Sequence, residues 1–226
     1  MRVRVATTAL GITAALLAVP ACTSGAPDTT TSSPTGKPAR SDQNAAPLSS
    51  AILKTRLLDE SDLGSGYARK PERSNQHDDV TVIGCPALNE LGGEAATGGT
   101  LTFPRKAKAT FTYADSTSEI SEELYSDSAD KLSDGIGRIF DTMTGCPQYQ
   151  VLVGGTAIDM TTQEVSPSQR GDEGWSQLLT FSTGGRDTVV KQTAIRDGNV
   201  LLILSGSPTL VDLHLNKAHA KLTAAR

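Results

Sequence analysis

The sequence is poor in the side chains that most enzymes use for catalysis. It contains three histidines, one tryptophan and only 4% aromatic residues. His214 and His219 would lie about 140° apart on a helix, so they cannot share a metal ion as histidines four positions apart do. His77 precedes Asp78 and Asp79 in a segment more typical of a solvated loop than of a cation site. Motifs for a serine nucleophile elbow, a zinc protease, a P-loop or a dinucleotide-binding turn are missing. We therefore expect no enzymatic activity, no cofactor and no metal site.

One short match to a catalytic motif is present. Ser128 and Lys131 have the Ser-x-x-Lys spacing of penicillin-binding enzymes, in which the lysine activates the serine. That chemistry also needs a Lys-Thr-Gly strand, and the nearest match here, Ser182-Thr183-Gly184, lacks the lysine. An ordinary helix N-cap accounts for Ser128.

The chain also lacks a basic excess and a long apolar run. Its net charge of -4 argues against a nucleic-acid-binding protein, which carries an excess of basic residues. It also argues against a polybasic segment that binds anionic lipid. The longest uncharged apolar run, about 15 residues, falls short of the roughly 20 that span a bilayer. We expect no nucleic-acid partner and no transmembrane segment apart from an export signal.

The first 22 residues have the order of a bacterial export signal. Arg2 and Arg4 supply a basic start, Val5–Val19 is uncharged and mostly apolar, and Val19-Pro20-Ala21-Cys22 resembles a lipobox. We predict a signal peptide over 1–21 and lipid attachment at Cys22. The mature protein would then be anchored to the lipid membrane through Cys22, on the extracytoplasmic face of the cell membrane.

Residues 22–46 are mostly Thr, Ser, Pro, Gly and Ala. Such a segment cannot bury enough apolar surface to offset the entropy cost of ordering it. We predict a lipidated, disordered tether with a reach on the order of 25–30 Å. Residues 47–226 then suit one domain with a single core.

With Cys22 assigned to lipid, two cysteines remain, Cys85 and Cys146. Disulfides persist outside the cytosol, so we expect these two to be bonded. Free thiols or metal ligands are the alternatives, but no CxxC or HxxH spacing supports a metal.

Apolar periodicity in the remaining chain predicts short strands flanked by helices. We expect helices over 48–58, 86–91, 127–143 and 208–222, the last with Leu210, Leu213, Leu215 and Ala218 toward the core. We expect strands over 80–83, 106–114, 118–125, 150–164, 175–182, 188–195 and 200–205. Tight turns between strands favour an α+β fold, in which an antiparallel sheet packs against N-terminal, central and C-terminal helices.

The only tryptophan follows a charged, glycine-containing segment. Arg170, Asp172 and Trp175 are candidate residues of a ligand cleft, in which the indole would form a stacking floor. We favour the alternative, a core tryptophan at a strand start behind an exposed turn. For Phe111, Tyr113 and Tyr125 we favour packing on the sheet over a ligand site.

Several short segments resemble an actinobacterial family of extracellular sensor domains, the PknH-like sensor domains. They are Leu57–Leu63, Cys85–Leu88, Ala109–Thr112, Gly145–Pro147, Gly171-Asp172 and the closing strand and helix at 200–222. The resemblance implies an α+β domain with a cleft that senses an unknown extracellular ligand.

These observations favour a membrane-anchored lipoprotein whose domain binds a small molecule or cell-envelope component without turnover. A membrane protein partner would then relay the signal. One alternative is a protein-interaction module that docks onto a membrane or cell-wall partner. Another is a lipid or glycolipid carrier, although the low aromatic content argues against a large apolar pocket.

Overall fold

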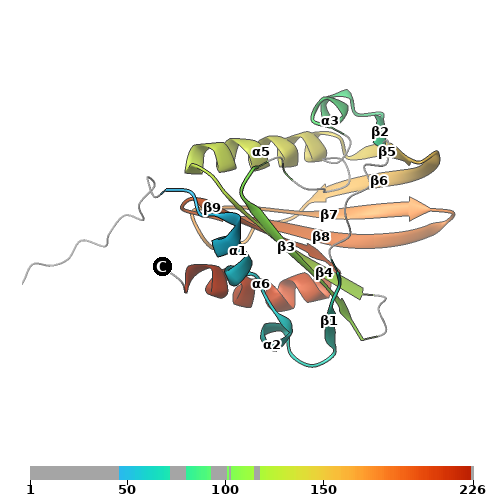
Figure 1. Cartoon of the computed structure of the whole chain (residues 1–226). Coiled ribbons are helices and arrows are strands. Elements are labelled where there is room, and N and C mark those ends of the chain that lie inside the picture. Colours follow the sequence, from blue (N-terminus) through green and yellow to red (C-terminus); the bar gives the residue numbers. More distant parts are fainter. Residues whose placement is uncertain (1–45, 72–79, 93–100, 102, 115–117, 225–226) are drawn as a thin grey trace, which may run out of the picture. The chain divides into compact units, whose positions relative to one another are not determined.

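The computed structural model describes residues 46–71, 80–92, 101, 103–114 and 118–224. Its centre is a nine-stranded sheet in the order β1-β3-β4-β9-β8-β7-β6-β5-β2, in which every pair of neighbouring strands is antiparallel (Figure 1). The strands are β1 (Tyr67–Arg69), β2 (Val80–Ile83), β3 (Lys106–Tyr113), β4 (Ser118–Ser126), β5 (Gln148–Val153), β6 (Thr156–Glu164), β7 (Glu173–Thr183), β8 (Arg186–Asp197) and β9 (Val200–Gly206). The helices are α1 (Ser50–Arg56), α2 (Glu60–Leu63), α3 (Pro86–Glu90), α5 (Ala129–Gly145) and α6 (Pro208–Thr223). The α+β fold with an antiparallel sheet is therefore confirmed.

Helices cover both faces of the sheet (Figure 1). Strand β9 is buried on both faces of the sheet. Its side chains point alternately to the core on one face and to the core on the other. Leu202 and Leu204 pack with the buried residues of α1 and α6, whereas Leu201 and Ile203 pack with those of α5. This double burial explains the unbroken apolar run of the strand.

Local signals in the sequence account for the helix ends. The Ser49 hydroxyl accepts a hydrogen bond from the Ile52 N–H at the start of α1, and Asp59 and Asp62 form a capping box around α2. Proline begins both α3 and α6, at a position where the missing N–H costs nothing.

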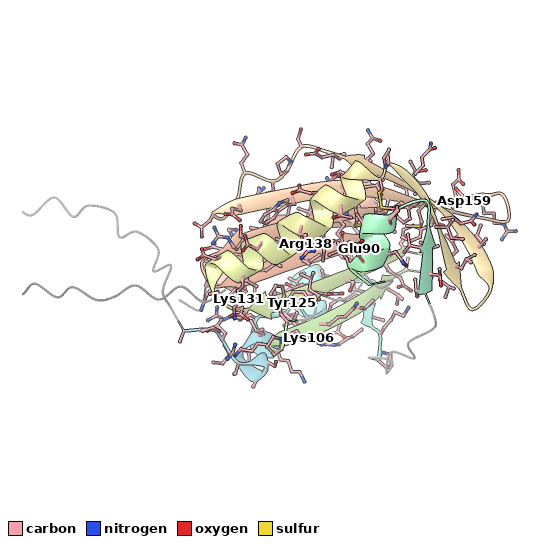
Figure 2. All side chains as sticks on the ribbon, turned by 90° about the horizontal axis from the view of Figure 1, so that it is seen from above. Glu90, Lys106, Tyr125, Lys131, Arg138 and Asp159 are labelled. Carbon is pink, nitrogen blue, oxygen red and sulfur yellow. A yellow bond between two sulfur atoms is a disulfide. The ribbon has the colours of Figure 1, made fainter. Side chains whose placement is uncertain are left out.

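Cys85 and Cys146 form a disulfide, as predicted, with their Cα atoms 5.9 Å apart. Cys85 precedes α3 and Cys146 follows α5, so the bond ties these two helices together on one face of the sheet. Figure 2 shows α3 beside the end of α5 in this layer. Leu88 and Met143 pack around the bond in a buried cluster with β5, β6 and β7.

Two expectations about individual elements were wrong, and one strand was missed. Residues 150–164 are not one strand, because Gly154 and Gly155 adopt φ angles of 54° and 85° and turn the chain between β5 and β6. Leu213 points away from the core and is 65% exposed. Strand β1, which pairs with β3, was not predicted, since three residues are too few to show alternation.

No helix of the described residues is long and apolar enough to cross a membrane. The predicted signal peptide, Cys22, the tether up to residue 45 and His77 lie outside the described residues.

Candidate functional site

The structure separates the three residues predicted to line a cleft. Trp175 lies on the face of the sheet covered by α5 and is half-buried against the cluster around Phe140. Asp172 instead binds Arg196, and Arg170 donates to the Ser168 hydroxyl at 3.2 Å in an exposed loop. Of the three, Trp175 lines the hollows described below, and its indole packs against the core cluster around Phe140.

Two hollows meet at Trp175, between α5 and the start of β7. The first has a volume of about 530 Å³ and is lined by Ser133, Asp134, Gly137, Arg138, Asp141, Thr142, Glu173 and Trp175. The second has a volume of about 70 Å³ and is lined by Phe140, Asp141, Thr144, Glu164, Pro167, Gly174, Trp175 and Ser176. Because the two hollows share Asp141 and Trp175, we treat them as one site, the Trp175 groove.

The outer face of α5 forms one wall of the groove. Asp134, Arg138 and Asp141 recur every three or four residues and therefore lie on one side of the helix, opposite its buried stripe. Figure 2 shows Arg138 on this outer face. Gly137 lies between them, and a Cβ atom there would stand 3.8 Å from the indole nitrogen of Trp175. A larger side chain at 137 would fill the groove over the indole.

An ion-pair network around Arg196 supports Glu173, which lines the groove. Arg196 is 5% exposed, and its guanidinium donates to Glu173 at 3.2 Å, to Asp172 at 3.0 Å and to the Gly198 carbonyl at 3.1 Å. Glu173 also accepts a hydrogen bond from the Ser133 hydroxyl of α5 at 2.5 Å. These bonds connect β7, β8 and α5, and they fix the position of Glu173 in the groove.

The same network shifts two pKa values. The hydrogen bond from Arg196 holds the pKa of Glu173 below its ordinary value, with a further contribution from Ser133. Burial alone would lower the pKa of Arg196, but Glu173 and Asp172 raise it above its usual range. Both groups are charged at neutral pH, which suits a permanent structural role rather than that of a proton donor.

The loop between β6 and β7 closes one end of the groove. A Cβ atom at Gly174 would stand 2.4 Å from the Ser168 carbonyl oxygen, so the loop lies directly on the backbone of β7. Gly171 adopts a φ angle of 68°, and a Cβ there would stand 2.4 Å from the Arg196 carbonyl oxygen. Both glycines allow the loop to approach β7 and β8 closely.

The groove is acidic. Its described lining residues include the carboxylates of Asp134, Asp141, Glu164 and Glu173, with Arg138 as the cation. Glu173 is neutralised by Arg196, which leaves an excess of negative charge on the solvent side. Such a lining favours neutral or cationic ligands over anions.

The other chemical candidates do not form a site. Lys131 lies 3.5 Å from Asp127 in an ion pair, which accounts for it without Ser128. His214 hydrogen bonds the Tyr67 hydroxyl at 2.6 Å, and His219 pairs with Asp197 at 3.0 Å. Among the described residues, no group of three histidine, cysteine or acidic side chains could hold a metal ion.

The predicted packing roles of the aromatic residues are confirmed for two of the three. Phe111 and Tyr125 are each 1% exposed. Tyr113 is 40% exposed and packs against Tyr67 with the rings tilted by 41° and 4.7 Å between their centroids.

Sequence comparison places the chain in no known group, since no protein-family model and no curated protein matches it. Structural comparison finds the crystal structure of the extracellular domain of PknH from Mycobacterium tuberculosis, with a TM-score of 0.59 and 14% identity over 79% of this chain and 98% of that chain. A Mycobacterium smegmatis protein, the Rv0999 ortholog, matches with a TM-score of 0.35 and 14% identity over 78% and 92% of the two chains. The first match shows that the fold is shared with the PknH extracellular domain, which confirms the resemblance seen in the sequence.

Proposed function

We propose that this chain is an extracytoplasmic, lipid-anchored binding protein that holds a small polar component of the cell envelope in the Trp175 groove without turnover. The observation that carries the proposal is a half-buried indole at the junction of two hollows lined by carboxylates. The predicted export signal and the shared fold with an extracellular domain support the location. Lipid attachment at Cys22 remains a prediction.

The chemistry of the groove favours a sugar or amino sugar as the ligand. An indole face packs well against the apolar face of a ring. The carboxylates of Asp134 and Asp141 can accept hydrogen bonds from hydroxyl or ammonium groups. A lipid carrier would instead need an apolar cavity, and this groove is lined mainly by polar and charged side chains.

A protein-docking function is the alternative. Leu213 of α6 and Val189 of β8 are 65% and 43% exposed. A docking surface would need such side chains gathered in one patch. A membrane protein bound to it would relay the signal.

Native mass spectrometry of the exported protein, purified from its own host, tests the groove. We expect a retained small molecule that is lost in Trp175→Ala and kept in Tyr113→Ala, which removes an exposed aromatic ring elsewhere. Retention of the same molecule by Trp175→Ala would contradict the groove. If the wild-type protein retains no molecule and binds no envelope sugar that is titrated into it, the docking function becomes the better proposal.

Fractionation of the host cells tests the anchor separately. We expect the wild-type protein in the membrane fraction with an N-terminal diacylglycerol adduct, and Cys22→Ala outside that fraction. A wild-type protein that retains residues 1–21 would contradict both the signal and the anchor.

A further inference from the structure

The smaller hollow of the Trp175 groove is lined by acidic and aromatic side chains. Its volume is about 70 Å³, and its described lining residues are Phe140, Asp141, Thr144, Glu164, Pro167, Gly174, Trp175 and Ser176. Two of these residues are carboxylates and two are aromatic, and none of the eight is an arginine, lysine or histidine. We call this part of the groove the small hollow.

The charged and aromatic residues of the small hollow meet on one face of the sheet. Trp175 pairs with Ala194 of β8, which belongs to the core cluster beneath α5. Glu164 pairs with Gln177, two residues after Trp175, so the Glu164 side chain lies on that same face. Asp141 is part of α5, the helix that covers this face. The strand register therefore places Glu164 and Trp175 on the side of the helix that carries Asp141.

The protein does not neutralise the two carboxylates of the small hollow. Among the described residues, Asp141 and Glu164 form no ion pair, and their carboxylates accept no hydrogen bond. Glu173, in contrast, is bound by Arg196 at 3.2 Å and lines only the larger hollow. Arg138 also lines only the larger hollow. The small hollow thus has two carboxylates without a cation of the protein to compensate them.

A buried acceptor lies next to Glu164. Gln177 stands opposite Glu164 in the pairing of β6 with β7, and the Cβ atoms of such a pair are about 5 Å apart. Gln177 is 0% exposed, and its amide oxygen has no hydrogen-bond partner among the described residues, whereas its amide nitrogen donates to Gln192 at 2.9 Å. A buried acceptor costs free energy unless a donor reaches it. This part of the structure is therefore rich in acceptors and short of donors.

We infer that the small hollow binds an ammonium group, held by the carboxylates of Asp141 and Glu164 with the Trp175 indole against it. An ammonium has three N–H donors and no acceptor, so it matches a set of acceptors that lacks a cation. Tryptophan is the aromatic side chain that attracts a cation most strongly. A volume of about 70 Å³ is roughly twice that of one water molecule in the liquid, which suits an ammonium and its first carbon but not a sugar ring.

This inference rests on the proposed function of the groove and narrows its ligand class. The larger hollow, of about 530 Å³, has room for a sugar ring and shares Asp141 and Trp175 with the small hollow. A sugar with a free amine would therefore lie across both hollows, with its amine in the small one. An N-acetylated sugar carries no charge at that position and would leave both carboxylates without a partner.

Fluorescence of Trp175, the only tryptophan of the chain, reports binding in the groove directly. The full exported protein is titrated with glucosamine, N-acetylglucosamine and glucose at pH 6, at which a primary amine is protonated. We expect glucosamine to bind about tenfold more tightly than either neutral sugar, or better. Equal or tighter binding of a neutral sugar would overturn the ammonium site and leave the groove as a sugar site. No response to glucosamine at about 50 mM would also overturn it, and native mass spectrometry decides the proposed function separately.

The variant Asp141→Asn/Glu164→Gln removes both negative charges and keeps the shapes of the two side chains. Both residues are exposed and unpaired, so we expect little change in the free energy of unfolding. Affinity for glucosamine should fall by about tenfold or more. The control variant Glu90→Gln/Asp159→Asn removes the same number of charges at exposed positions that line neither hollow, and it should change the affinity less than about twofold. Equal losses in the two variants would overturn the site, because they would show only an effect of net charge.

Discussion

The carboxyl of Glu122 lies under the end of α1 and accepts a hydrogen bond from the Leu58 N–H at 2.6 Å. The side chain is 1% exposed, and its second oxygen has no hydrogen-bond partner among the described residues. Burial raises the pKa of Glu122 to about 8, although the Leu58 bond, Lys221 and Arg69 act to lower it. The carboxyl is therefore largely protonated at neutral pH, and its ionisation opposes the packing of α1 on β4.

This relationship predicts that the protein loses stability as the pH rises. The folded state keeps the Glu122 proton up to about pH 8, whereas the unfolded chain releases it near the ordinary value of 4.5. Between these values the folded state binds more protons, so the free energy of unfolding falls with increasing pH. We expect a decline on the order of 3–5 kcal/mol from this group, measured by urea denaturation from pH 5 to 9.

Glu122→Gln should remove most of this pH dependence, because an amide oxygen can accept the Leu58 bond without ionising. Glu119→Gln is a matched control on the same strand, since Glu119 is exposed. A wild-type protein whose stability did not change over this range would show that Glu122 is already ionised in the fold.

Much of the fold could be predicted from the pattern of apolar residues. This pattern is clearest in elements that have one buried face and one exposed face. Strand β3 was recognised from alternation, and the hairpin of β8 and β9 from the turn at Asp197-Gly198-Asn199 and the apolar run that follows it. The turn at Gly154-Gly155 was missed, because Val151–Ile158 reads as one apolar segment with two glycines inside it. Leu213 was misplaced since residues 210, 213 and 215 do not all lie on one face of a helix.

The candidate site was less predictable than the fold. Trp175 was recognised as the single large aromatic residue beside a charged loop, but its partners come from α5, more than 30 residues earlier in the chain.

Removing the disulfide should destabilise the domain strongly. The bond links residues 61 positions apart, and closing a loop of that length contributes about 4 kcal/mol by the chain-entropy relation. We expect Cys85→Ala/Cys146→Ala to lose about this free energy of unfolding in urea. Alkylation of the unreduced, denatured wild-type protein should label neither cysteine, and labelling of both would contradict the bond.

Gly171→Ala should cost more than an ordinary glycine substitution. The new Cβ would meet the Arg196 carbonyl oxygen at 2.4 Å, in addition to the strain of a positive φ angle. Gly184→Ala is the control, because Gly184 also has a positive φ but nothing lies within 4 Å of its added Cβ. We expect a loss of about 1 kcal/mol at 184 and at least about 2 kcal/mol at 171, measured by urea denaturation. Equal losses would mean that the loop does not lie on β8 as described.

Arg196→Lys tests whether the ion-pair network fixes Glu173 in the groove. A lysine cannot reach Glu173, Asp172 and the Gly198 carbonyl together, because its single ammonium lacks the planar fork of the guanidinium. We expect a loss of about 1–3 kcal/mol at pH 7, whereas Arg186→Lys in the exposed β7–β8 turn should change little. The lowered pKa of Glu173 adds a pH dependence, since its contribution is present above its ordinary value of 4.5 and is lost as the pH falls through its folded value. The difference in unfolding free energy between wild type and Arg196→Lys should therefore shrink in acid, and a difference that stayed constant down to pH 2 would mean that the network contributes through packing alone.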